Sequence, residues 1–194
     1  MEKNRLEAFS DGIIAIIITI MVLELKVPHN PTWQNYIDAY PLFVSYALSF
    51  VFVGLYWSTH HHLFHRARTV NNRILWFNML SLFWLSLIPF TTATMGASAF
   101  ADITVAFYAA VLALVTLSYV ILVQQLCRLH GADSAFSKAY TGHSKSYVTI
   151  GLNTSAAIIS LIGFPKIAFI AICLIALIWF VPNFRIENNL KEEE

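Results

Sequence analysis

The chain has 194 residues, of which 58% are hydrophobic and 12% are charged, and its mean hydropathy is +0.65. This composition is typical of integral membrane proteins rather than of soluble domains. A net charge of +1 provides no basic surface for nucleic acid, and no nucleic-acid-binding motif is present. The two cysteines, Cys127 and Cys173, lack the spacing of a metal or redox motif.

Six apolar stretches are long enough to cross a bilayer, which predicts an all-α, polytopic membrane protein with six transmembrane helices per subunit. Prolines help to locate the ends of these helices, because a proline is tolerated in the first turn of a helix and interrupts the helix elsewhere. The predicted helices cover residues 6–27, 41–61, 71–90, 102–129, 144–163 and 165–181. Residues 1–184 form one predicted transmembrane domain, and residues 185–194 form a charged C-terminal tail.

Lysine and arginine are distributed unequally between the two sides of this predicted bundle. Ten of the twelve lie on the side that holds both termini, and only Lys26 and Lys166 lie on the other. Positively charged residues are enriched in the cytoplasmic segments of membrane proteins. We therefore expect a multi-pass protein of the cell membrane with both termini in the cytoplasm.

The first predicted helix carries ionisable side chains at its start, although the rest of it is mostly apolar. Arg5, Glu7 and Asp11 lie within about two helical turns of one another. Each costs at least a few kcal/mol if it faces hydrocarbon, so such groups normally face protein or water. Asp11 has the shortest side chain of the three and cannot reach far from its own backbone.

Projection at about 100° per residue divides this helix into two faces. Within about 40° of Arg5 lies one stripe along the helix, made of Phe9, Gly12, Ile16, Thr19 and Leu23. Ser10 and Asp11 project away from it, at about +140° and −120°. We expect the apolar stripe, with its single hydroxyl, and the polar cluster to have different roles.

The second predicted helix ends in a run of histidines, His60, His61, His62 and His65. Imidazole binds zinc and iron, but no carboxylate cluster completes a site, so no metal centre is predicted. One interpretation is an interfacial cluster near the lipid headgroups. We favour the other, a hydrogen bond from His60 or His61 to Asp11 or Ser10 that fixes the first helix. Asn78, in the third helix, is a further candidate partner.

The order of these motifs resembles the lysosomal and endosomal potassium channel family, whose bacterial members have one six-helix repeat. The resemblance extends over nearly the whole chain, and it rests on Arg5, Phe9, Ser10 and Asp11, then on Trp57, His60 and His61, and then on Asn78 and the Pro89–Phe90 pair. It implies a homotetramer in which the first helices line a central pore. No nucleophile–base pair or cofactor motif is visible, and we predict neither enzymatic activity nor a cofactor.

The family's pore positions, carried over to this chain, are Ile16, Thr19 and Leu23. The chain lacks the carbonyl filter motif Thr-Val-Gly-Tyr-Gly, and a ring of isoleucines has no oxygen with which to replace an ion's hydration shell, so the expected constriction gates by dewetting. Thr19 would discriminate between ions, unless its hydroxyl bonds back to its own helix. Glu24 forms an outer acidic site, or it pairs with Lys26 or another subunit.

The sequence thus predicts a potassium-favouring cation channel. Its expected partners are potassium and other monovalent cations, the lipid bilayer and further copies of the chain, and nucleic acid is not among them. The alternative is a proton-coupled or other secondary transporter that uses Asp11, Glu24 and the His60–His62 cluster. The segments show no inverted repeat and no matching pair of broken helices, which disfavours the transporter.

Overall fold

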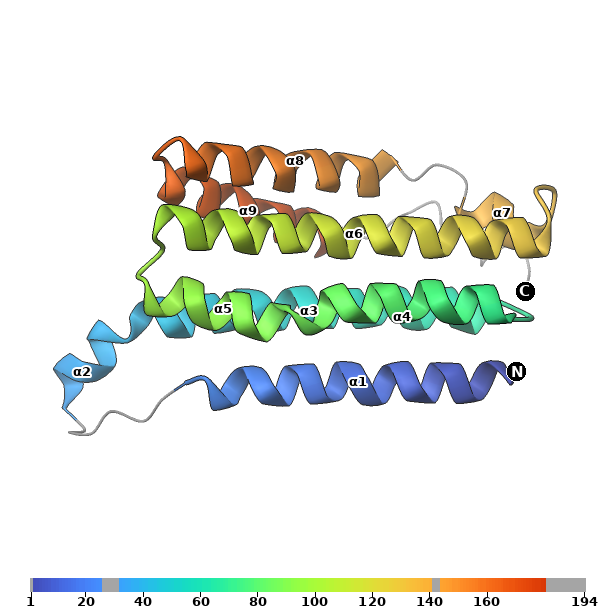
Figure 1. The fold of residues 1–194 in the computed structure, drawn as a ribbon, viewed down its shortest axis with the longest axis horizontal. Helices are drawn as coiled ribbons and strands as arrows, with labels where there is room; N and C mark the ends of the chain where they lie inside the picture. Colours follow the sequence, from blue (N-terminus) through green and yellow to red (C-terminus); the bar gives the residue numbers. More distant parts are fainter. Residues whose placement is uncertain (1, 26–31, 141–143, 181–194) are drawn as a thin grey trace.

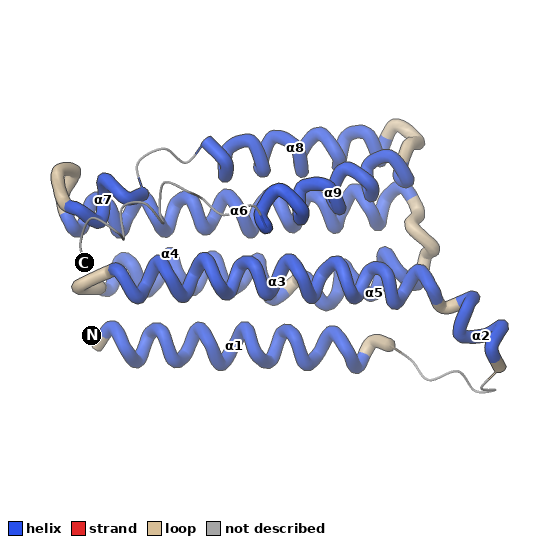
Figure 2. Tube along the Cα trace, turned by 180° about the vertical axis from the view of Figure 1, so that it is seen from behind, coloured by secondary structure: helices blue, strands red, loops and turns tan. Residues whose placement is uncertain are grey.

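The computed structural model describes residues 2–25, 32–140 and 144–180, and all the regular elements in these ranges are helices. They are α1 (Lys3–Leu23), α2 (Trp33–Asp38), α3 (Tyr40–Arg66), α4 (Asn72–Ser86), α5 (Ile88–Ala97), α6 (Asp102–His130), α7 (Ala135–Tyr140), α8 (Ser144–Leu161) and α9 (Pro165–Phe180). The long helices run side by side in layers, with α1 at one edge and α8 at the other (Figure 1). The same order is visible from behind, where α3 lies next to α1 (Figure 2).

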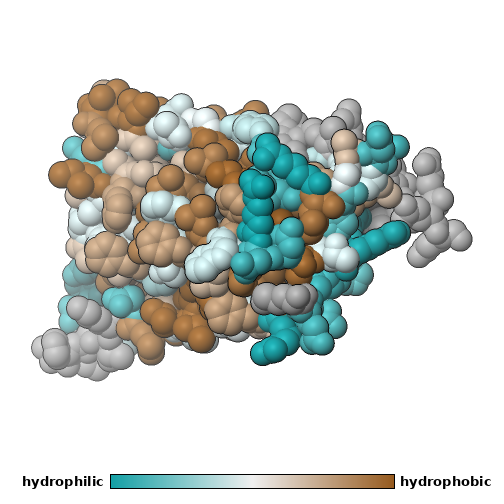
Figure 3. Space-filling view, turned by 45° about the vertical axis from the view of Figure 1, so that its right-hand side comes forward, coloured by the Kyte–Doolittle hydropathy of each residue, from teal (hydrophilic) through white to brown (hydrophobic). Residues whose placement is uncertain are grey.

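Four helical segments in the described ranges are long and apolar enough to cross a membrane: α1, α3, α4 together with α5, and α6. The helix α9 is apolar but shorter. Hydrophobic residues cover much of the visible surface, whereas hydrophilic residues gather towards the end where α1 begins (Figure 3). The described part of the chain is therefore all-helical, and its long apolar helices are typical of a multi-pass membrane protein.

Several predicted helix boundaries differ from the observed ones. The helix α1 ends at Leu23 rather than at residue 27, which lies outside the described residues, and α3 continues to Arg66 rather than ending at residue 61. The histidine run is therefore helical. The helices α6, α8 and α9 end within two residues of the predicted positions 129, 163 and 181. The C-terminal tail, residues 185–194, lies outside the described part of the chain.

The third predicted helix, 71–90, is wrong in both its continuity and its length. It is interrupted at Leu87 and resumes as α5, which continues to Ala97. Pro89 occupies the first turn of α5. Proline has no backbone N–H, and its ring clashes with the carbonyl four residues earlier, so the hydrogen-bond ladder stops just before it. The short helices α2 and α7 were not predicted, because six residues are too few to show helical periodicity.

Buried hydroxyl groups connect the layers of the bundle. The Tyr108 hydroxyl of α6 lies 2.9 Å from Ser49 Oγ of α3, to which Thr92 of α5 donates at 2.7 Å. A second link joins Tyr56 of α3 to Ser81 of α4, with 2.7 Å between their hydroxyl oxygens. Hydrogen bonds of this kind between membrane helices contribute about 1 kcal/mol each, so the two links hold α3, α4, α5 and α6 together.

Gly96 marks the closest approach of α5 to α3. A Cβ atom at this position would lie 2.9 Å from both Cα and Cδ2 of Leu42. One of these atoms belongs to the backbone of α3, so the helices would have to separate to admit even a methyl group. Small residues permit such close helix contacts in membranes.

We expect Gly96→Ala to lower the free energy of unfolding by about 1–3 kcal/mol, the usual cost of overpacking. Thermal or denaturant unfolding of the detergent-solubilised protein measures this change. Gly151→Ala is the matched control, because a Cβ at Gly151 meets nothing within 4 Å. Equal stability of the two variants would show that α3 and α5 are not in close contact at Gly96.

Candidate functional site on helix α1

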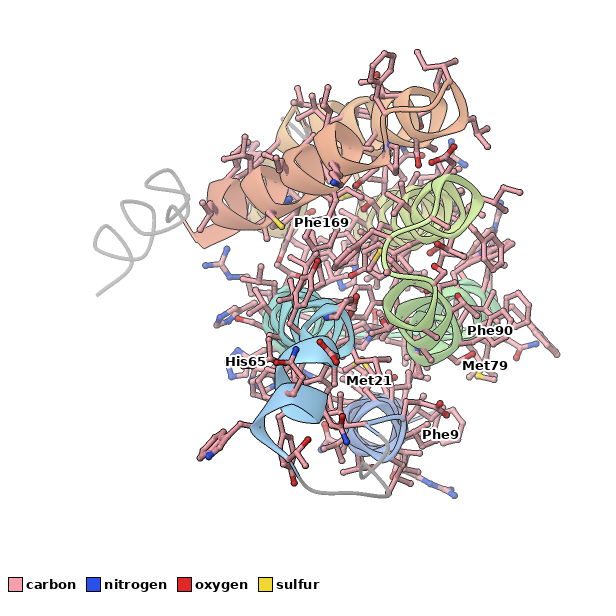
Figure 4. All side chains as sticks on the ribbon, turned by 90° about the vertical axis from the view of Figure 1, so that its left-hand side faces the viewer. Phe9, Met21, His65, Met79, Phe90 and Phe169 are labelled. Carbon is pink, nitrogen blue, oxygen red and sulfur yellow. The ribbon has the colours of Figure 1, made fainter. Side chains whose placement is uncertain are left out.

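One face of α1 packs against the rest of the bundle. Its buried residues recur every three or four positions and are Leu6, Ser10, Ile14, Ile17 and Met21. This spacing places them on one side of the helix, in contact with α3, α4 and α5. In a view along the helices, Met21 lies between α1 and the rest of the bundle, whereas Phe9 lies to one side of α1, outside this contact (Figure 4).

The opposite face of α1 is uncovered in the single chain. Phe9 is 49% exposed, Ile16 57% and Leu23 76%. Gly12 and Thr19, the remaining members of the stripe, are exposed as well. The five residues that the sequence placed on one stripe therefore form a continuous outward-facing strip along α1.

The hydroxyl of Thr19 bonds back to its own helix. It donates to the backbone carbonyl of Ile16 across 2.9 Å, which is the local bond that the sequence analysis left open. A hydroxyl oxygen that donates its proton retains lone pairs with which it can accept. The exposed side chain of Thr19 therefore still offers an acceptor at the surface of α1.

A directional chain of hydrogen bonds fixes the packed face of α1. His60 Nε2 lies 2.8 Å from Asn78 Oδ1, and because this oxygen only accepts, the imidazole must be the donor. The amide Nδ2 of Asn78 donates to Ser10 Oγ across 2.8 Å, and Ser10 Oγ donates to the carbonyl of Leu6 at 2.9 Å. His60, Asn78 and Ser10 are fully buried, so α1, α3 and α4 meet at one polar point inside an apolar bundle.

A second group of contacts joins the start of α1 to the end of α3. The indole Nε1 of Trp57 donates to Asp11 Oδ1 across 3.0 Å, and the Trp57 ring stacks on His61 with 5.6 Å between centroids. His61 Nδ1 lies 3.4 Å from Glu7 Oε1, an ion pair only when the imidazole is protonated. Arg5, the first residue of the predicted motif, is exposed.

The predicted direct bond from His60 or His61 to Asp11 or Ser10 is therefore wrong in detail. His60 reaches Ser10 only through Asn78, and the observed partner of Asp11 is Trp57. A hydrogen bond needs the two polar atoms within about 3 Å, and the helix spacing leaves room for an intervening amide. Over the described ranges, no group of three or more His, Cys, Asp or Glu side chains could hold a metal ion.

A groove runs between α1 and α5 beside the exposed strip. It has a volume of about 640 Å³, and its lining includes Ile16 and Ile20 of α1, Phe90 and Ala93 of α5, and Glu24. Glu24 is exposed, and its predicted partner Lys26 lies outside the described residues. This groove was not predictable from the sequence, because its walls depend on how far α5 continues beyond Pro89. The small residues Ala93 and Ala97, four positions apart, are the sequence signal that indicates a close helix neighbour.

The chain is similar in sequence to several known proteins. The family model described as endosomal/lysosomal potassium channel TMEM175 matches residues 5–89. A potassium channel from Chryseobacterium sp. (strain P1-3) is 45% identical over 99% of this chain and 100% of its own length. The endosomal/lysosomal proton channel TMEM175 of Rattus norvegicus is 37% identical over 46% of this chain and 20% of its own length.

A solved structure has a similar fold. The crystal structure of a lysosomal potassium-selective channel TMEM175 homolog from Chamaesiphon minutus superposes with a TM-score of 0.81 at 24% identity. The match covers 93% of this chain and 97% of the other. At this identity the superposition establishes the fold.

Ser10→Ala is expected to lower the free energy of unfolding by about 1–3 kcal/mol, because it leaves the buried Asn78 amide without an acceptor. Thermal unfolding measures this loss. Ser86→Ala is the control, since the exposed Ser86 hydroxyl only donates to the carbonyl of Phe83 in its own helix. If the two substitutions cost the same, the chain from His60 to Ser10 does not anchor α1.

The Asp11–Trp57 contact is tested by a double-mutant cycle. Asp11→Ala and Trp57→Phe each remove one partner, so each should destabilise the protein by about 1 kcal/mol, and the double variant should lose less than the sum. Unfolding midpoints of the four proteins provide the coupling energy. A second cycle, of Asp11→Ala with His61→Ala, tests for comparison the direct pairing that the sequence suggested. Strictly additive losses for Asp11 and Trp57 would mean that the two residues act separately.

Proposed function

The chain belongs to the TMEM175 family, and on that premise we propose that it is a potassium-favouring cation channel with α1 lining the pore of a homotetramer. The family and the relatives are ion channels rather than enzymes. Membership of the family and the absence of an enzymatic role, both predicted from the sequence, are thereby confirmed.

The proposal rests on one observation, the division of α1 into an anchored face and an uncovered face. A helix at the edge of a membrane bundle meets either lipid or another subunit with its outer face. The strip on α1 includes Gly12 and the hydroxyl of Thr19, and it is flanked by the carboxylate of Glu24. Polar and small side chains in this position favour contact with a water-filled axis over contact with lipid.

We propose six membrane-spanning segments within one domain, residues 1–184: α1, α3, α4 with α5, α6, α8 and α9. The start of α1 and the end of α3 lie at the same end of the bundle (Figure 1), where Lys3 Nζ approaches the carbonyl of His65 at 3.5 Å. Arg66 and Arg68 belong to this end as well. Their positive charge supports a cytoplasmic location of this end and of both termini, in the cell membrane.

The pore proposed here has no carbonyl filter and closes at a ring of Ile16 side chains. This ring lies between Gly12, which is too small to occlude, and Thr19, which can be hydrated. Four converging side chains form an apolar neck in which water is poorly held, so an ion loses hydration there without replacement. Leu23 adds a second apolar ring one turn beyond Thr19, and the threonine oxygens provide the polar contact that distinguishes ions.

Glu24 is proposed as the outer acidic site of this pore. Its exposed carboxylate follows the last turn of α1, and a ring of such carboxylates raises the local concentration of cations at a pore mouth. The positions of Asp11 and Glu24 argue against a transporter in which both belong to one relay. They are thirteen residues apart, about 20 Å along a helix, and the side chains of α1 between them are apolar except for Thr19.

Proton permeation is a second candidate activity, because the mammalian relatives are named proton channels. A shift of the reversal potential with a pH gradient, at constant potassium, would reveal it in bilayers. Potassium permeation alone predicts no such shift.

Ile16→Asn should wet the neck and raise the conductance, because it supplies polar atoms where the ion has none. Thr19→Val keeps the volume but removes the hydroxyl, so it should mainly lower the preference for potassium over sodium. Currents and reversal potentials of the purified protein in bilayers, under potassium and sodium gradients, measure both effects. Native mass measurement establishes whether each variant is a tetramer.

The matched controls lie on α8. Ile158 is 57% exposed, as Ile16 is, and Thr154 donates to its own helix at 2.8 Å, as Thr19 does. Ile158→Asn and Thr154→Val should leave conductance and ion preference unchanged. An unaltered current in a correctly assembled Ile16→Asn channel would place the gate elsewhere.

A further inference from the structure

A second cavity lies among α3, α6, α8 and α9, on the side of α3 away from α1. Its volume is about 60 Å³. Most of its wall is apolar, and its polar groups are contributed by Tyr56 and Thr59 of α3, Thr116 and Tyr119 of α6, and Thr149 and Asn153 of α8. The Tyr56 hydroxyl is already paired with Ser81, 2.7 Å away. Trp179 of α9 lies against it.

Asn153 is the unusual member of this wall. Its side chain is 1% exposed, and within the described part of the chain neither Nδ2 nor Oδ1 has a hydrogen-bond partner. An unpaired amide in an apolar environment costs several kcal/mol. Buried polar groups are almost always paired with protein or with a bound molecule, so the amide indicates a ligand.

The threonine hydroxyls around the cavity determine which hydrogen-bond donors and acceptors a ligand needs. Thr59, Thr116 and Thr149 each donate to a carbonyl of their own helix, at 2.9 Å for the shortest bond of each. Thr149 also accepts from Trp179 Nε1 at 2.9 Å. The protons of the threonines are therefore engaged, while the oxygens of Thr59 and Thr116 retain lone pairs that face no other donor in the described residues.

We propose that this cavity binds a small neutral hydroxyl compound. The hydroxyl oxygen accepts from Asn153 Nδ2, and the hydroxyl proton is donated to Asn153 Oδ1 or to a threonine oxygen. No charged side chain of the described residues lines the cavity, so a charged ligand would be desolvated without compensation. The volume exceeds the roughly 10–15 Å³ that one water molecule needs, and water or a small alcohol such as methanol supplies this chemistry.

Nuclear magnetic resonance of the full chain, labelled with ¹⁵N-asparagine in phosphatidylcholine nanodiscs, tests the proposal. The amide protons of Asn153 should show a cross-peak to water, and added methanol should shift the amide signal saturably. A cross-peak to water without a methanol shift identifies the ligand as water. A saturable shift identifies an alcohol site. An amide that senses neither water nor methanol overturns the proposal.

Asn153→Leu provides an independent measurement and assigns the amide signal. A ligand-filled site makes Asn153 a paired residue, so the substitution should lower the unfolding midpoint. A higher midpoint would mean that the amide was unpaired in a dry cavity, and it overturns the proposal. Thr154→Val, on the exposed side of the same helix, is the control and should leave the midpoint and the Asn153 signal unchanged. If Asn153→Leu does not fold, Thr116→Val assigns the signal through its shift.

Discussion

The buried bond from Asn78 to Ser10 is the interaction on which the position of α1 depends. Hydrocarbon offers no partner to an amide or a hydroxyl, so each polar side chain in a membrane bundle must find its partner inside the protein. Asn78 is satisfied on one side by Ser10 and on the other by His60. Rotating α1 by one residue would break the chain, because it carries the Ser10 hydroxyl away from the Asn78 amide.

This constraint determines which face of α1 is uncovered. With Ser10 held towards α3 and α4, the opposite side carries Phe9, Ile16 and Leu23, all of which are exposed. The contact between Trp57 and Asp11 adds a second anchor at the same end of the helix. The packed face with its buried Ser10 and the exposed strip are therefore consequences of one rotational setting, which the proposed pore requires.

Pro89 determines the position of α5, on the other side of the groove from α1. The interruption at Leu87 allows α5 to continue to Ala97, where the absence of a side chain at Gly96 admits the backbone of α3. The proline and the glycine together bring α5 close to α3 and leave the groove beside α1. A straight, uninterrupted helix would have placed Phe90 and Ala93 differently, because every later side chain follows the axis of its helix.

Residue order alone predicts the membrane class of the protein, the grouping of Phe9, Gly12, Ile16, Thr19 and Leu23 on one side of the first helix, and the family. Composition, helical periodicity and the motif residues are local properties, which need no knowledge of neighbours. Asn78 and His60 were recognisable from the sequence as polar residues in need of a partner. Their partners follow from the packing of the helices: Asn78 lies between His60 and Ser10, and Trp57 lies beside Asp11. A hydrogen bond depends on distances of a few tenths of an ångström between side chains from different helices, and residue spacing along one chain does not specify them.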